Sequence, residues 1–478
     1  MPTDRSSSFS SLELHPDVLR NLASLGFEKM TPIQAHGLAP VLRGQDVIAQ
    51  AKTGSGKTAV FGLGLLSKLD PTNFEVQSLV LCPTRELADQ VAEEIRRLAR
   101  TMNNVKVLTV CGGTPFRIQA GSLEHGAHIV VGTPGRIEDH LRKGTLKLHN
   151  LGTLVLDEAD RMLDMGFQET LEIIIGQLPK KRQTLLFSAT YPQQIQLIAT
   201  RVMQDPVTVR VDATHDNETI RQHFYKVRDE RQRREALRLL LLKHRPESAL
   251  VFCSTKRETE EIAAELREHG FSAIALHGDL EQRDRDQTLV RFSNRSVSVL
   301  VATDVAARGL DIDALDAVIN YHIARDVEVH LHRIGRTGRA GSKGTAYSLI
   351  SDKEGYKVAL LEDYLDHAIV TEALPPETLL REAAGRPKMA TIVIDGGKKQ
   401  KIRPGDILGA LTGENGIAGT QVGKINVFDM RSFVAVQADA AKSALAKLTA
   451  GKLKGRSFRS RLISSHAVSK RRKRVGGS

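Results

Sequence analysis

The chain has 478 residues, a formal net charge of +12, 41% hydrophobic residues and 26% charged residues. This length is more than one hydrophobic core usually supports, and the composition excludes a wholly disordered chain. No segment approaches the ~18–20 consecutive apolar residues that a membrane span needs, and the first dozen residues lack a secretory signal. Three scattered cysteines, Cys82, Cys111 and Cys253, form no CxxC pair. They favour a reducing compartment, so we expect a cytoplasmic multidomain protein without a membrane partner.

Residues 1–210 alternate short apolar strands with helical stretches, which predicts βαβ units on a parallel sheet. Strands are expected at 46–50, 78–82, 106–110, 128–132, 153–157 and 184–188. Residues 211–370 repeat the pattern, with strands expected at 249–253, 272–276, 298–302, 317–321 and 345–349. In the helix expected at 258–270, Ile262 and Leu266 share one face and Gly270 ends the helix. Two tandem α/β domains follow from this pattern.

Beyond these domains, Pro375 and Pro376 interrupt any helix and indicate a linker over 371–387. Residues 388–463 follow a βαββαβ order, which predicts a small α+β domain of ferredoxin-like or RNA-recognition type. The basic tail, 464–478, is expected to be disordered.

The positive charge lies in the last part of the chain. Residues 386–478 contain 20 Lys and Arg against 5 Asp and Glu, whereas residues 1–385 contain 48 against 51. A basic module joined to a nearly neutral body is typical of a protein that binds nucleic acid or another anionic surface. A solubilising tail would explain the KRRKR run at 470–474 equally well, but not the patterned module before it.

A phosphate-binding loop follows the first strand. Gly54 and Gly56 allow backbone N–H groups to turn toward phosphate oxygens, and a helix N-terminus follows directly. Lys57 is expected to reach the β- and γ-phosphates, and the Thr58 hydroxyl to hold Mg²⁺. The whole loop comprises Ala51, Lys52, Thr53, Gly54, Ser55, Gly56, Lys57 and Thr58.

Two carboxylates complete a nucleotide-hydrolysing site. Asp157 emerges at the end of the strand TLVLD, where it is expected to meet Mg²⁺. Glu158 follows directly and is a candidate general base for the attacking water. After a strand alone, these two acids would be an ordinary solvated turn. Together with the phosphate-binding loop they predict ATP and Mg²⁺ as cofactors.

Six segments in this order resemble the motif set of the DEAD-box RNA helicases: AKTGSGKT, PTRELA, TPGR, DEAD, SAT and HRIGRTGR. The resemblance covers residues 9–350 and implies two RecA-like domains that close together on ATP and RNA. It implies that Gln34 reads the adenine edge, that Thr31 supports this loop, and that Phe9 stacks on the base; a hydrophobic staple is the alternative for Phe9. The other ATP and coupling residues it implies are the arginine fingers Arg336 and Arg339, the nucleotide contacts Gly309 and Asp311, and the coupling pair Ser188 and Thr190.

The same resemblance implies RNA contacts from both domains, mostly to phosphate and sugar and therefore independent of sequence. These residues are Thr84, Arg85, Gly113, Thr133 and Arg136 in the first domain, and Gln282, Arg285, Thr303 and Arg308 in the second. For any single arginine a surface salt bridge is the alternative. His332 fits a domain interface or a satisfied core histidine equally well.

The carboxy-terminal module is similar to that of a bacterial subfamily whose recognition domain anchors it to a hairpin of 23S ribosomal RNA. The resemblance implies a monomeric helicase acting on pre-50S ribosomal particles. The candidate RNA contacts of this module are Lys398, Lys401, Arg403, Lys424, Lys454, Arg456 and Arg459. Because its strands carry few aromatic residues, base stacking on the sheet face, including on Phe433, is doubtful.

Three alternatives remain open at this point. The module could be a nonspecific tether on a general RNA helicase, or the protein could be an ATP-dependent RNA clamp without productive unwinding. A DNA helicase is disfavoured, because the contacts of the family reach ribose hydroxyls.

Overall fold

In the computed structural model, the described residues are 8–51, 55–191, 193–211, 220–307, 315–338 and 344–463. The basic tail predicted at 464–478 lies outside them. The chain divides into two compact units near residue 215, and each is described by itself.

The first unit is built on a seven-stranded parallel sheet of order β3-β4-β2-β5-β6-β1-β7. Its strands are β1 Val47–Gln50, β2 Ser78–Leu81, β3 Val107–Val110, β4 Ile129–Gly132, β5 Thr153–Leu156, β6 Gln183–Ser188 and β7 Val207–Arg210. Its helices are α1 Pro16–Ser24, α2 Pro32–Leu42, α3 Lys57–Lys68, α4 Arg85–Leu98, α5 Phe116–Glu124, α6 Pro134–Arg142, α7 Ala159–Asp164, α8 Gln168–Gly176 and α9 Gln193–Val202.

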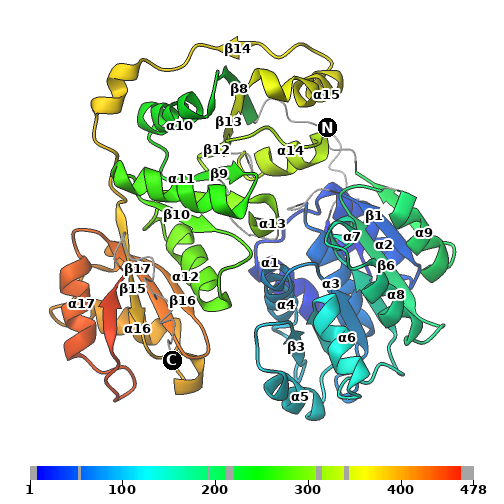
Figure 1. The fold of residues 1–478 in the computed structure, drawn as a ribbon. Coiled ribbons are helices and arrows are strands. Elements are labelled where there is room, and N and C mark those ends of the chain that lie inside the picture. Colours follow the sequence, from blue (N-terminus) through cyan, green and yellow to red (C-terminus); the bar gives the residue numbers. More distant parts are fainter. Residues whose placement is uncertain are drawn as a thin grey trace, which may run out of the picture. The chain divides into compact units, whose positions relative to one another are not determined.

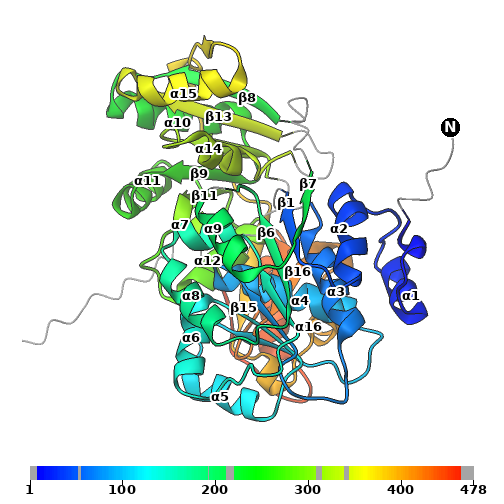
Figure 2. The same cartoon turned by 90° about the vertical axis from the view of Figure 1, so that its right-hand side faces the viewer.

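Helices cover both faces of this sheet (Figure 2). One apolar core joins α2, α3 and α4 to one face, and a second joins α6, α8 and α9 to the other. The strands are therefore apolar on both faces, which is why they read as continuous hydrophobic runs rather than as alternating patterns. The neighbouring strands β5, β6 and β1 bring the ends of three sequence-distant segments to one edge of the sheet.

The second unit contains another seven-stranded parallel sheet, of order β10-β11-β9-β12-β13-β8-β14. Its strands are β8 Ile220–Lys226, β9 Ala249–Cys253, β10 Ala273–Leu276, β11 Val299–Thr303, β12 Ala317–Asn320, β13 Gly344–Ile350 and β14 Thr371–Glu372. Its helices are α10 Glu230–His244, α11 Lys256–Glu268, α12 Gln282–Ser293, α13 Asp304–Ala307, α14 Val327–Ile334 and α15 Gly355–Leu365.

The same unit ends in a four-stranded antiparallel sheet of order β16-β17-β15-β18, packed on two helices. The elements are β15 Met389–Ile394, α16 Pro404–Thr412, β16 Val422–Val427, β17 Ser432–Gln437, α17 Ala441–Ala450 and β18 Ser460–Leu462 (Figure 1). The predicted fold class, two RecA-like parallel-sheet domains and a small βαββαβ domain, is therefore confirmed.

The structure differs from the expectation at the segment 371–387, predicted as a linker. It contains β14, paired with β8, and a short 3₁₀ helix, Glu377–Arg381. Leu374, Leu379 and Leu380 pack against the core of the second unit. The prolines do interrupt any α-helix. The leucines around them nevertheless pack on the domain core, so the segment is not a free linker.

Candidate functional site

The phosphate-binding loop is tied to the segment before α2. Thr31 Oγ1 donates to the Ser55 carbonyl oxygen (2.8 Å), and Gln34 Nε2 donates to the Gly56 carbonyl oxygen (3.2 Å). Gly56 has φ +94°, and a Cβ at this position would lie 2.5 Å from Gln34 Nε2. Only glycine therefore fits here. Lys52, Thr53 and Gly54 lie outside the described residues.

Gln34 is 2% exposed, and its Oε1 accepts a hydrogen bond from the Thr31 backbone N–H (2.9 Å). The side chain therefore holds the loop in place in addition to any contact with a base. Phe9 is 4% exposed and packs edge-on against Phe27, with ring centroids 5.8 Å apart. This is the packing of a core residue, and base stacking by Phe9 stays a prediction.

A buried cation and two buried acids lie where β1 and β5 end. Lys57, at the start of α3, donates from Nζ to the Ala51 carbonyl oxygen (3.0 Å). Burial raises the pKa of Asp157 to about 6, Lys57 opposes the rise, and neighbouring Glu158 adds to it. The next residue of the loop, Thr58, is half-buried. The ionised form of Asp157 is thus poorly compensated by the protein alone, which suits a carboxylate that receives a cationic ligand.

Glu158 occupies an unusual backbone position, with φ +51° at the N-terminus of α7. Its Oε2 accepts a hydrogen bond from Arg161 Nη1 (2.6 Å), and both side chains are only 5% exposed. A non-glycine residue in this conformation is strained, and strain of this kind is concentrated at functional positions. The contact with Arg161 holds the Glu158 carboxylate in one orientation.

Asp160 links α7 to the end of β6. Its Oδ2 accepts hydrogen bonds from the backbone N–H of Ala189 (3.1 Å), the backbone N–H of Thr190 (2.9 Å) and Thr190 Oγ1 (3.0 Å). The Asp160 N–H donates to Ser188 Oγ (3.3 Å). Although burial opposes it, the hydrogen bonds from Thr190 hold the pKa of Asp160 below its ordinary value. Both predicted coupling residues therefore contact Asp160: Ser188 through the backbone N–H of Asp160, and Thr190 through its carboxylate.

The predicted RNA contacts of the first unit gather around α4 and α6. Thr84 caps α4, and Thr133 stands at the start of α6. The Arg85 guanidinium lies against a glycine pair, since a Cβ on Gly112 or Gly113 would come within 2.8 Å or 2.0 Å of it. A larger residue at either glycine would have to displace the Arg85 guanidinium from this position.

Arg136 donates from Nη1 to the Thr114 carbonyl oxygen (2.8 Å) and to Gln119 Oε1 (2.6 Å). Gln119 in turn donates to the Cys111 carbonyl oxygen (2.8 Å) and contacts the buried ring of His140 (3.2 Å). Burial, followed by the charge of Arg136, lowers the pKa of His140 to about 4. Sequence reasoning missed Gln119 and His140, which carry no motif signal.

In the second unit, Arg285 donates from Nη2 to the Ala306 carbonyl oxygen (2.9 Å), which ties α12 to the segment after β11. In the same region Gln282 bonds to Asp286 (2.8 Å), and Thr303 is 9% exposed. Arg336 is 4% exposed, and His332 is half-buried. Arg308, Gly309, Asp311 and Arg339 lie outside the described residues.

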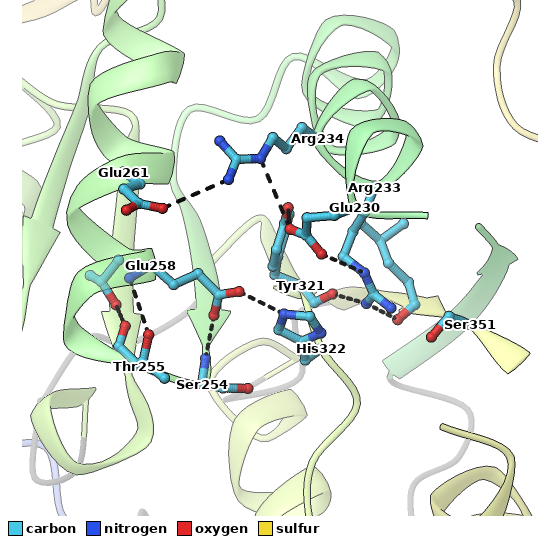
Figure 3. A network of polar contacts seen from close by, with 12 residues as sticks. Glu230, Arg233, Arg234, Ser254, Thr255, Glu258, Glu261, Tyr321, His322 and Ser351 are labelled. Atoms are coloured by element: carbon cyan, nitrogen blue, oxygen red, sulfur yellow. Dashed lines mark hydrogen bonds and ion pairs between the residues drawn. The ribbon is translucent and has the colours of Figure 1, made fainter. Parts of the chain in front are cut away.

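A polar network lines the ends of β9, β12 and β13 in the second unit (Figure 3). The buried Arg233 donates to Glu354 (2.5 Å) and to the Leu349 carbonyl oxygen (2.9 Å). Next to it, His322 Nε2 bonds to Glu258 Oε1 (2.7 Å). Although burial opposes it, hydrogen bonds to Glu258 and Glu354 raise the pKa of His322 to about 9. The network fixes the loops that follow three adjacent strands.

The candidate contacts of the carboxy-terminal module fall into two groups. Lys398, Lys401, Arg403, Lys454, Arg456 and Arg459 are exposed. Lys424 is exposed as well, but its Nζ donates to Ser293 Oγ of α12 (3.0 Å). Phe433 is 4% exposed and packs with Val290 and Val393, so its ring is not accessible to a base. Helix α12 covers this part of the sheet face, which explains why a base cannot stack on Phe433.

Comparison with known proteins agrees with this arrangement. Residues 31–198 match the DEAD/DEAH box helicase family, residues 232–341 the helicase conserved C-terminal domain, and residues 391–462 the DbpA RNA binding domain. The chain belongs to the DEAD-box ATP-dependent RNA helicases. It is an RNA helicase and ATPase that carries an RNA-binding domain of the DbpA type.

The similarity to individual members is extensive. The chain is 52% identical over 458 residues to ATP-dependent RNA helicase DbpA of Escherichia coli K12, which covers 96% of this chain and all of that protein. It is 44% identical over 375 residues to DEAD-box ATP-dependent RNA helicase CshA of Bacillus cereus, covering 77% and 71% of the two chains. Saccharomyces cerevisiae Dbp5 bound to RNA and ADP BeF3 superposes with a TM-score of 0.68 at 29% identity, over 78% of this chain and 99% of that one. Among the described residues, no helix is long and apolar enough to cross a membrane.

The raised pKa of Asp157 predicts an acidic limit to ATP hydrolysis. Because kcat/KM reports ionisations of the free enzyme, we expect its acidic limb near pH 6 rather than near pH 4. Below that pH the Asp157 carboxyl group is neutral and no longer supplies the negative charge that a bound cation needs. The measurement is RNA-stimulated ATPase activity from pH 5 to 8, with circular dichroism as the control for folding. A flat profile down to pH 5 would contradict the assignment.

Proposed function

We propose that the first unit hydrolyses ATP with Mg²⁺ at the edge of the sheet formed by β1, β5 and β6. Thr58 and Asp157 would hold the metal, which supplies electrostatic stabilisation of the phosphates. The residues fit such an ion, because the buried carboxylate of Asp157 is poorly compensated by Lys57 alone. Lys57 neutralises phosphate charge, and Gln34 selects adenine.

Glu158 is the proposed general base. Its contact with Arg161 orients the carboxylate, as the position of a base that accepts a proton from water requires. Arg336 and Arg339 of the second unit are the proposed arginine fingers, which are worth roughly 10³ to 10⁵ in rate in related phosphoryl transfers. Gly309 and Asp311 would contact the nucleotide. Because the site needs residues from both units, ATP and RNA favour the same closed state and reinforce each other's binding.

RNA is proposed to bind through its backbone along Thr84, Arg85, Gly113, Thr133 and Arg136 of the first unit. In the second unit the contacts are Gln282, Arg285, Thr303 and Arg308. Bending of one strand on closure would separate a short duplex, since each stacked pair costs on the order of 1–2 kcal/mol to break.

We further propose that the carboxy-terminal domain anchors the enzyme to a hairpin of 23S ribosomal RNA, and that it acts as a monomer on pre-50S particles in the cytoplasm. The similarity to DbpA over nearly the whole chain and the exposed basic residues of the module support this proposal. A general RNA helicase with a nonspecific basic tether is the alternative, and the similarity to CshA outside this domain is compatible with it.

Substitution of Glu158 tests its role as the general base. Replacing Glu158 with Gln keeps the shape and the neighbour Arg161 but removes the proton acceptor. We expect ATP hydrolysis to fall by about 10²-fold or more, while ATP and RNA stay bound together. Single-turnover hydrolysis and filter binding of labelled RNA with ATP measure the two effects. Normal turnover in this variant would show that another group accepts the proton.

A comparison of different RNAs tests whether the carboxy-terminal domain recognises ribosomal RNA. ATPase stimulation by 23S ribosomal RNA fragments is compared with stimulation by random RNA of equal length. We expect preference for one ribosomal fragment, and loss of that preference on deletion of residues 388–478 with basal ATPase activity retained. Equal stimulation by all RNAs in the intact protein would favour the nonspecific tether.

A further inference from the structure

Helix α12 has two functional ends. Its first turn carries Gln282 and Arg285, the proposed RNA contacts. Its last turn and the residues after it pack on the sheet of the carboxy-terminal domain, where Val290 joins an apolar cluster with Val393 and Phe433 (Figure 1). One rigid helix of the second unit thus reaches from the helicase domain to the RNA-binding domain.

Polar contacts extend this junction. Thr391 of β15 is fully buried, and its Oγ1 receives a hydrogen bond from Asn294 Nδ2 (3.3 Å) and contacts Ser296 Oγ (2.7 Å). Lys388 Nζ pairs with Glu247 Oε1 (2.5 Å). Directional contacts of this kind specify one register between the two surfaces.

Two arginines, Arg431 and Arg461, contact the same Asp395 at one side of this junction, and Arg283 of α12 is close enough to Arg431 to affect its charge. Burial, and next the charge of nearby Arg283, lower the pKa of Arg431, and Arg461 acts in the same direction. Asp395 and Asp284 oppose the effect. Arg283 is exposed, and Arg431 and Arg461 are half-buried, so all three side chains are open to a ligand from solvent.

The contacts of these arginines with Asp395 are long. Arg431 Nε and Arg461 Nη1 each lie 3.5 Å from an Asp395 oxygen. Charge-assisted hydrogen bonds normally measure about 2.7–2.9 Å, and the buried Asp395 Oδ1 has no hydrogen-bond partner among the described residues. Asp395 therefore pairs only loosely with Arg431 and Arg461, and both guanidinium groups keep donors that it does not engage.

The loop that carries Arg431 also offers apolar surface. Met430 is 55% exposed and Phe428 is 36% exposed. The backbone N–H groups of Lys398 and Lys399 donate to the carbonyl oxygens of Phe428 (2.8 Å) and Asp429 (2.9 Å). The approach is so close that a Cβ on Gly397 would lie 2.0 Å from the Phe428 carbonyl oxygen. A fixed loop that exposes an aromatic ring next to cations suits a nucleotide base with its phosphate.

We propose that Arg283, Arg431 and Arg461 form a phosphate-binding seam that receives a single RNA strand as it leaves Gln282 and Arg285. The backbone of the strand binds the guanidinium groups, and Phe428 with Met430 contacts a base. The seam joins the helicase track to the RNA-binding domain into one path. This inference rests on the RNA-binding activity of the family and not on the choice of 23S ribosomal RNA.

Full-length protein and oligouridylate strands test the seam. A short strand fills only the helicase track, whereas a long one continues to the seam. For Arg431→Gln and, separately, Arg283→Gln, we expect the affinity for the long strand to fall roughly fivefold or more. The slope of log affinity against log salt should become shallower by about 0.7 for each phosphate that the variant no longer neutralises. The affinity for the short strand should be unchanged. Fluorescence anisotropy measures each quantity.

Lys442→Gln is the matched control, because it removes an exposed charge on α17 away from α12. Arg283→Gln keeps the pairing of Asp395 intact, so its result does not depend on the fold of the RNA-binding domain. Equal reductions in affinity for short and long strands, or reductions no larger than that of Lys442→Gln, would overturn the proposal. Because oligouridylate is not ribosomal, failure of the 23S proposal leaves this test unaffected.

Discussion

The structure depends most on one buried carboxylate. Asp160 accepts three hydrogen bonds from Ala189 and Thr190 while its own N–H donates to Ser188. It lies two residues from Glu158, the proposed base, in the same short segment. A shift of the proposed base on loss of the γ-phosphate would be passed to the end of β6 through these hydrogen bonds, because a charge-assisted network of this kind is costly to leave unsatisfied. We propose that this is how hydrolysis reaches the RNA track.

The second unit also contains a buried network of charged side chains, but this one fixes loops. Arg233 and His322 are cations held among acids and carbonyl oxygens at the ends of β9, β12 and β13. Buried pairs of this kind contribute little net stability, but the removal of one partner is expensive. They fix the loops after β9, β12 and β13, whereas the proposed RNA and nucleotide contacts of this unit lie on α12, at the end of β11 and after α14.

The fold class could be predicted from the sequence, since apolar runs, glycines and prolines mark most strands and helix ends. Ile262 and Leu266 are both buried as predicted, and Gly270 follows α11 with φ +85°. Strands β7, β8 and β14 escaped prediction. The edge strands β7 and β14 are short and partly exposed, and β8, which lies between β13 and β14, interrupts its apolar residues with polar ones. Contacts that join distant segments, such as Arg136 with Gln119 or Val290 with Phe433, have no periodic signature. Only the packed structure reveals them.

Substitution of both hydroxyl residues, Ser188→Ala with Thr190→Ala, tests the proposed link most directly. These changes remove side-chain contacts to Asp160 and leave the backbone N–H bonds of Ala189 and Thr190 in place. The measurement is the number of ATP molecules hydrolysed for each short RNA duplex released. The account predicts that RNA-stimulated hydrolysis persists while duplex release becomes much less efficient, so that this ratio rises by about tenfold or more, the equivalent of one charge-assisted hydrogen bond. An unchanged ratio would contradict it.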